Sequence, residues 1–234
     1  MSKSKYNVVT PDTICVEYGA DTLRLYEMFL GPLEQSKPWN TAGISGVFGF
    51  LKKLWRLYND DNNGWVVTNN EPSKDSLKSL HKTIKKVNED IENFSFNTSV
   101  SQFMICVNEL TAQNCHERAI LEPFAVLISP YAPHIAEDLW SQLKDLKTEE
   151  LKDFNGISHE PFPVVDEKYL VESSKEYPVS FNGKMRFTIE LSLDLSVAEI
   201  QEIIMKDERT IKQLEGRTPN KIIIVPGKVI NLVG

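Results

Sequence analysis

The stretch that decides the fold is "NTAGISGVFGFLKKLWRLY", residues 40–58. Its apolar residues recur at spacings of three and four, which places them along one side of an α-helix. They are Ile44, Val47, Phe48, Leu51, Leu54, Trp55 and Tyr58. Because such a stripe must be buried against other elements, the segment predicts a long amphipathic helix with further helices around it.

Further helices are predicted on both sides of this segment. In residues 10–30, Thr10 can cap a helix that starts at Pro11, Gly19 can end it, and Asp21 can begin the next. Downstream, apolar spacing indicates helices at three places, the last one bent or broken near Pro130 and Pro133. These are residues 77–91, residues 100–110 and residues 117–143, with Pro130 and Pro133 in the last. The expectation is a bundle of five or six helices.

The pattern changes after Leu146. A proline-bearing, acidic stretch with little periodicity is predicted to be a linker, and two strand-like runs then flank Asn182 and Gly183, a strong hairpin signal. A helical run and two short strands around Pro226 and Gly227 follow. The predicted class is mainly α, with a small α+β domain at the end. Its expected parts are residues 1–18, a helical domain over 19–150, a linker over 151–176 and the α+β domain over 177–234.

Composition is that of an ordinary globular protein. Of the 234 residues, 41% are hydrophobic and 25% are charged, and no apolar run approaches the roughly 20 residues of a membrane span. There is no signal-peptide core, so the expected location is the cytoplasm, away from membranes. The three cysteines form no CxxC pair and the four histidines are scattered, which argues against disulfides and against a metal site.

The net charge of −7 counts at first against nucleic-acid binding, but two zones are basic. Lys78, Lys82 and Lys85 share one face of a predicted helix, and Lys86 flanks them. The second zone lies in the terminal domain and consists of Lys184, Arg186, Arg209, Lys212, Arg217 and Lys221. The first zone could equally be a solvated helix face, and members of the second could be charges that protect strand edges.

A resemblance is carried by four stretches. "MSKSK", residues 1–5, resembles the KMSKS signature of class I aminoacyl-tRNA synthetases without its first lysine. "RLYEMFLGPLEQSKPWNTAGISGVFGFLKKLWRL", residues 24–57, and "NGKMR" with "KIIIVPGKVINLV", residues 182–186 and 221–233, resemble the bacterial leucyl-tRNA synthetase family. The resemblance runs along essentially the whole chain.

This resemblance implies a C-terminal fragment that begins at the signature motif. The family's Rossmann half with its HIGH-type motif has no counterpart here, and neither has its editing domain. The parent enzyme would attach leucine to tRNA(Leu) with ATP and Mg2+, whereas the fragment is expected to be inactive, monomeric and without a bound cofactor. Lys3 would be the catalytic residue, and Ser2, Lys3 and Ser4 would hold ATP, since mobile lysines can stabilise charge developing on its phosphates.

The resemblance also names the expected partners, which are tRNA(Leu) and the rest of the parent synthetase. Both basic zones would then contact tRNA phosphates through shape and backbone rather than through base readout. Two alternatives stay open at this point. One is a stand-alone helical protein-interaction module that binds no RNA, and the other is the corresponding part of a valyl or isoleucyl ligase.

Overall fold

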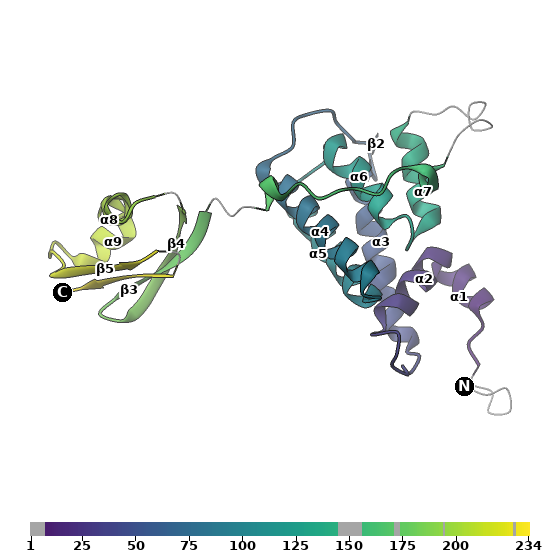
Figure 1. The fold of residues 1–234 in the computed structure, drawn as a ribbon, viewed down its shortest axis with the longest axis horizontal. Coiled ribbons are helices and arrows are strands. Elements are labelled where there is room, and N and C mark those ends of the chain that lie inside the picture. Colours follow the sequence, from purple (N-terminus) through teal and green to yellow (C-terminus); the bar gives the residue numbers. More distant parts are fainter. Residues whose placement is uncertain (1–7, 145–155, 171–173, 194, 227) are drawn as a thin grey trace. The chain divides into compact units, whose positions relative to one another are not determined.

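The computed structural model describes residues 8–144, 156–170, 174–193, 195–226 and 228–234. The chain divides into two compact units, Met1–Leu170 and Val171–Gly234 (Figure 1). In their described parts the first unit is helical and the second combines strands with helices, so the prediction of a mainly α chain with a small α+β part is confirmed.

The first unit is built from helices that pack around one apolar core. Those described are α1 (Pro11–Tyr18), α2 (Ala20–Phe29), α3 (Ile44–Tyr58), α4 (Lys74–Glu92), α5 (Phe96–Ala112), α6 (Arg118–Ile128) and α7 (Pro133–Leu143). A short hairpin follows α3, with two residues in each strand, β1 (Asn59–Asp60) and β2 (Gly64–Trp65). None of the described helices has the length and apolar character that crossing a membrane requires.

The predicted break between the first two helices is confirmed. Gly19 has φ +89°, a left-handed conformation that favours glycine, and its amide donates to the carbonyl of Cys15 at 3.0 Å. The second helix starts at Ala20, one residue before the expected Asp21. Asp21 is instead buried, and its carboxylate accepts from the amide of Ile135 at the start of α7.

Helix α3 carries the predicted apolar stripe, but it begins at Ile44 and not at Asn40. Asn40 caps a short 3-10 turn, Thr41–Gly43, by accepting from the amide of Ala42 at 3.0 Å. Within the stripe Ile44, Val47 and Leu54 are fully buried, whereas Phe48 and Trp55 are only half-buried. The two aromatic rings therefore lie at the border of the core.

The predicted break near the two prolines is also confirmed. Helix α6 ends at Ile128, and Pro133 starts α7 at the position where a missing amide hydrogen costs nothing. Across the core, the fully buried Tyr58 hydroxyl donates to the carbonyl of Leu121 at 2.7 Å and so ties α3 to α6.

Residues 156–170 differ from the expected linker because they pack on the first unit. Ile157 is buried, and its amide donates to the Glu137 carboxylate at 3.1 Å. Strand β3 then begins at Ser174, before the expected end of the linker. The segment is anchored by single residues at irregular spacing, which periodicity cannot detect.

The second unit contains a four-stranded sheet in the order β4-β3-β6-β5. Its elements are β3 (Ser174–Phe181), β4 (Lys184–Ser192), α8 (Val197–Lys206), α9 (Glu208–Leu214), β5 (Lys221–Val225) and β6 (Val229–Val233). The neighbouring pairs β3–β4 and β5–β6 are antiparallel, whereas β3 and β6 are parallel. The predicted turn at Asn182 and Gly183 is confirmed, with both residues at positive φ.

The helical run of this unit is two helices rather than the single one expected. Ser196 and Glu199 form a reciprocal capping box at the start of α8. Asp207 then adopts an extended conformation, ψ 127°, ends α8 and caps α9 by accepting from the amide of Arg209. Its preference for capping over a helix interior explains the break.

Candidate nucleic-acid interface

Two of the four predicted lysines of α4 are free. Lys78 is half-buried and Lys82 is exposed, one turn apart on the same helix face. Within the part of the chain that the structure describes, neither makes an ion pair. Their ammonium groups are therefore available to an external anion.

Lys85 is bound by Glu167, which belongs to the segment of residues 156–170 that packs on the helices of the first unit. Its Nζ lies 3.0 Å from Oε1 of Glu167, and this bond raises the pKa of Lys85. Beside it, Tyr169 stacks on His81 with 4.7 Å between ring centres, and the amide of Asp166 donates to Nδ1 of His81 at 3.1 Å. Burial lowers the pKa of His81, which favours the neutral ring that accepts this bond.

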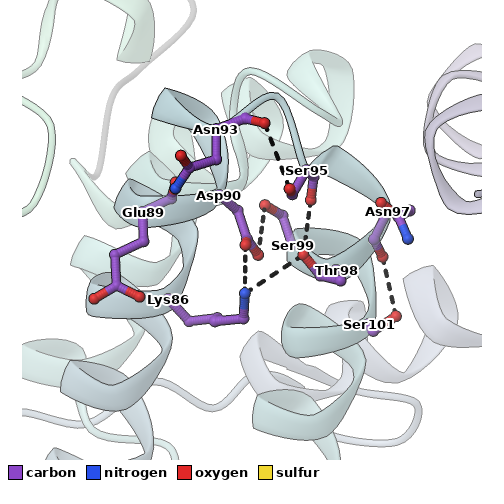
Figure 2. A network of polar contacts seen from close by, with 9 residues as sticks. All are labelled: Lys86, Glu89, Asp90, Asn93, Ser95, Asn97, Thr98, Ser99 and Ser101. Atoms are coloured by element: carbon purple, nitrogen blue, oxygen red, sulfur yellow. Dashed lines mark hydrogen bonds and ion pairs between the residues drawn. The ribbon is translucent and has the colours of Figure 1, made fainter. Parts of the chain in front are cut away.

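Lys86 belongs to a polar network between α4 and α5 (Figure 2). Its ammonium pairs with Asp90, whose side chain is 4% exposed, and it lies 3.5 Å from the Thr98 hydroxyl. The Ser99 hydroxyl donates to the second carboxylate oxygen of Asp90 at 3.4 Å. The structure thus separates Lys85 and Lys86, which are held by carboxylates, from Lys78 and Lys82.

Three of the six predicted basic residues of the second unit meet at one hollow. Lys184, Arg186 and Arg217 are exposed and line a cavity of about 680 Å³, together with Asn182 and Glu215 among others. Within the described residues the three cations form no ion pair. Cations grouped around a concave surface are suited to a phosphate of an extended ligand.

The remaining members of this zone do not line that hollow. Lys212 on α9 and Lys221 at the start of β5 are exposed. Arg209 is bound inside the unit, since it pairs with Asp207 at 2.8 Å and donates to the carbonyl of Thr188 at 3.0 Å. It also lies over the ring of Phe187, so its contacts hold α9 against β4.

The signature residues Ser2, Lys3 and Ser4 lie outside the described residues. Over the ranges that are described, no group of three histidine, cysteine or acidic side chains is arranged to hold a metal ion.

A cluster of basic and aromatic residues on α3 is not among the sequence predictions. Lys52 and Arg56 line a hollow of about 610 Å³ together with Phe48 and Trp55. Phe48, Lys52, Trp55 and Arg56 lie close together in the sequence, but apolar spacing assigns the two aromatic residues only to the apolar stripe of the helix.

Comparison with known proteins identifies the family. The family described as the anticodon-binding domain of tRNA ligase matches residues 73–202, more than half of the chain. The chain belongs to this family. The leucine–tRNA ligase of Flavobacterium psychrophilum is 79% identical over 234 residues, which are 100% of this chain and 23% of that protein. Those of Christiangramia forsetii and Bacteroides thetaiotaomicron are 67% and 49% identical and are covered to 23% and 24%.

This member of the anticodon-binding family therefore spans about a quarter of the length of the curated relatives it matches, and the matched region of the Flavobacterium psychrophilum ligase is its C-terminal part. A solved LeuRS of Agrobacterium radiobacter K84, in a ternary complex with tRNA and LeuAMS, has a TM-score of 0.64 and 24% identity. The match covers 100% of this chain and 30% of that one, and shows a shared fold. The resemblance to leucyl-tRNA synthetases is confirmed.

Proposed function

We propose that this chain is the tRNA-binding C-terminal part of a leucine–tRNA ligase. The observation that carries the proposal is the 79% identity to such a ligase over all 234 residues. In the proposal the first unit is the helical bundle of a class I synthetase anticodon-binding-type domain. The whole ligase acts in the cytoplasm and joins leucine to tRNA(Leu) with ATP and Mg2+.

The free cations support a phosphate contact in each unit. Lys78 and Lys82 in the first unit, and Lys184, Arg186 and Arg217 in the second, carry positive charge on a chain whose net charge is −7. An acidic protein that keeps such groups unpaired can attract a polyanion locally while its remaining surface repels it. These contacts would position tRNA without reading its bases.

The chemistry of amino-acid activation would need the rest of the ligase. Lys3, with Ser2 and Ser4, would stabilise charge on the ATP phosphates, a role that the family resemblance implies. ATP and Mg2+ would act in the whole enzyme, and the isolated chain, a monomer, would bind neither. Leucine-dependent pyrophosphate exchange by the pure chain above a no-protein control would refute its predicted inactivity.

The central experiment measures binding of a tRNA(Leu) transcript by the whole chain at several salt concentrations. Lys78→Ala with Lys82→Ala should weaken binding and flatten the log–log salt dependence, by about 0.9 units for each phosphate that the variant no longer neutralises. Lys184→Ala with Arg217→Ala should act in the same way. Lys53→Ala is the matched control, because this lysine lies on another helix, α3, and its Nζ donates to Asn108 at 2.9 Å. A wild-type chain that binds no tRNA, or equal slopes in all variants, would overturn the proposal.

A further inference from the structure

The hollow of about 610 Å³ in the first unit has the composition of a nucleotide site. It is lined by the turn between α1 and α2, by one face of α3 and by the start of α7. Aromatic and basic side chains alternate on its α3 wall, where Phe48, Lys52, Trp55 and Arg56 follow one another at helical spacing. This mixture differs from a purely apolar groove, which would suit another protein surface.

The aromatic side chains offer rings at the surface. Tyr18 and Phe48 meet edge to face with 5.7 Å between ring centres, and Lys52 Nζ lies 4.2 Å from the centre of the Phe48 ring. Trp55, about two turns after Phe48 on α3, is half-buried. An unpaired base can stack on such a ring.

The cations of the hollow are available to a phosphate. Lys52 is exposed and has no carboxylate partner in the described part of the chain. Arg56 lies 3.2 Å from Asp61, but the two side chains are 61% and 69% exposed. An ion pair this exposed contributes little and can exchange for a stronger anion.

Two acidic residues line the hollow, Asp61, which faces Arg56, and Asp21, which already has hydrogen-bond donors from the protein. Asp21 accepts from the amide of Ile135 at 2.7 Å and from Nδ1 of His134 at 2.7 Å. It therefore caps α7 and holds the His134 ring, whose side chain is 71% exposed, at the edge of the hollow. Its charge is stabilised by these two donors.

A larger hollow of the same unit, about 870 Å³, does not fit this ligand. Its lining includes Met28, Ile91 and Phe96 together with the acidic Glu27 and Glu92. The arginine of this lining, Arg24, donates to the carbonyls of Pro130 and Tyr131 and does not offset the two glutamates. The α3 hollow, with Lys52 and Arg56, is therefore the better site for a phosphate.

We infer that the α3 hollow binds a single unpaired nucleotide of RNA. The base stacks on Trp55 beside Tyr18, and the phosphate is held by Lys52 and Arg56. The inference rests on the proposed tRNA function and adds a site to it, separate from the lysines of α4. Stacking on one aromatic side chain accounts for roughly 1–3 kcal/mol per base, which corresponds to a change in affinity of about 5- to 150-fold.

The test uses the whole chain and a fluorescein-labelled tRNA(Leu) transcript, with binding followed by anisotropy. Trp55→Leu should weaken binding by about 5-fold or more, whereas Trp55→Phe, which keeps an aromatic ring, should stay within about 3-fold of wild type. Lys52→Ala should flatten the salt dependence by about one unit. The matched control is Lys53→Ala, the next residue of α3, whose Nζ donates to Asn108 at 2.9 Å outside the hollow.

Several results would overturn this inference. They are an unchanged affinity in Lys52→Ala, an equal loss in Lys53→Ala, and an equal loss in both Trp55 variants. Competition adds a test of stacking. A uridine hexamer should displace tRNA better than a stable blunt-ended RNA duplex at the same concentration of nucleotides. If the wild-type chain binds no tRNA, the proposed function fails as well. If wild type binds tRNA and only the α4 variants lose affinity, the α3 site is refuted while the proposed function stands. If Trp55→Leu does not fold, the Lys52→Ala result decides.

Discussion

Replacing either partner of the Lys86–Asp90 pair should cost different amounts of unfolding free energy, because the two side chains are buried to different extents. The Asp90 side chain is 4% exposed, whereas that of Lys86 is 42% exposed. Lys86→Met removes the cation and leaves a buried carboxylate with only the Ser99 hydroxyl. Asp90→Asn leaves an ammonium group that water can reach.

The magnitudes follow from that asymmetry. Removing one partner of a buried ion pair costs about 3–5 kcal/mol, and we expect about 3 kcal/mol for Lys86→Met, since Ser99 still donates to the carboxylate. For Asp90→Asn we expect about 1 kcal/mol, because the amide keeps an oxygen for Ser99 and the ammonium rehydrates. The change is nearly isosteric, so it adds no cavity term.

Urea unfolding followed by tryptophan fluorescence measures these costs. The four tryptophans, Trp39, Trp55, Trp65 and Trp140, all belong to the first unit, so the signal reports that unit alone. Equal costs for the two variants, or a larger cost for Asp90→Asn, would refute the reasoning. Asp90→Asn also frees the ammonium group of Lys86, one turn from Lys82. The salt dependence of tRNA binding by this variant should therefore be unchanged or steeper, although the first unit is less stable.

Other positions give shorter predictions. Asp21→Ala removes the carboxylate that caps α7 and should lower the free energy of unfolding of the first unit by about 2 kcal/mol in the same urea assay, with Asp21→Asn losing less. Gly19→Ala should cost about 1 kcal/mol, because its φ of +89° strains any side chain, and a loss below about 0.3 kcal/mol would contradict this. The pKa of His81 is lowered by burial, so the unfolded chain takes up this proton first as the pH falls. Stability should therefore be complete above about pH 6.5 and decline below it until the folded pKa is reached, and the decline should be smaller in His81→Gln, measured by urea midpoints at several pH values.

Much of the local structure was predictable from sequence, because local rules govern it. The apolar spacing of α3, the glycine break at Gly19 and the turn at Asn182 each depend on residues a few positions apart. Capping at Ser196 is local in the same way. At Asp207, where local preferences compete, the sequence predicts one helix and the structure has two.

The sequence by itself thus determined the helices, the hairpin, the family resemblance and the basic residues that a polyanion could use. The tertiary structure decided which of those residues are free. Lys85 pairs with Glu167, which lies 82 positions away, and residues 156–170 pack on the helices of the first unit although they lack any period. Charge pairing depends on distance in space, and in a folded chain that distance is set by how the elements pack and not by sequence spacing. For the same reason the hollow on α3 appears only once Tyr18, Trp55 and His134 are brought together.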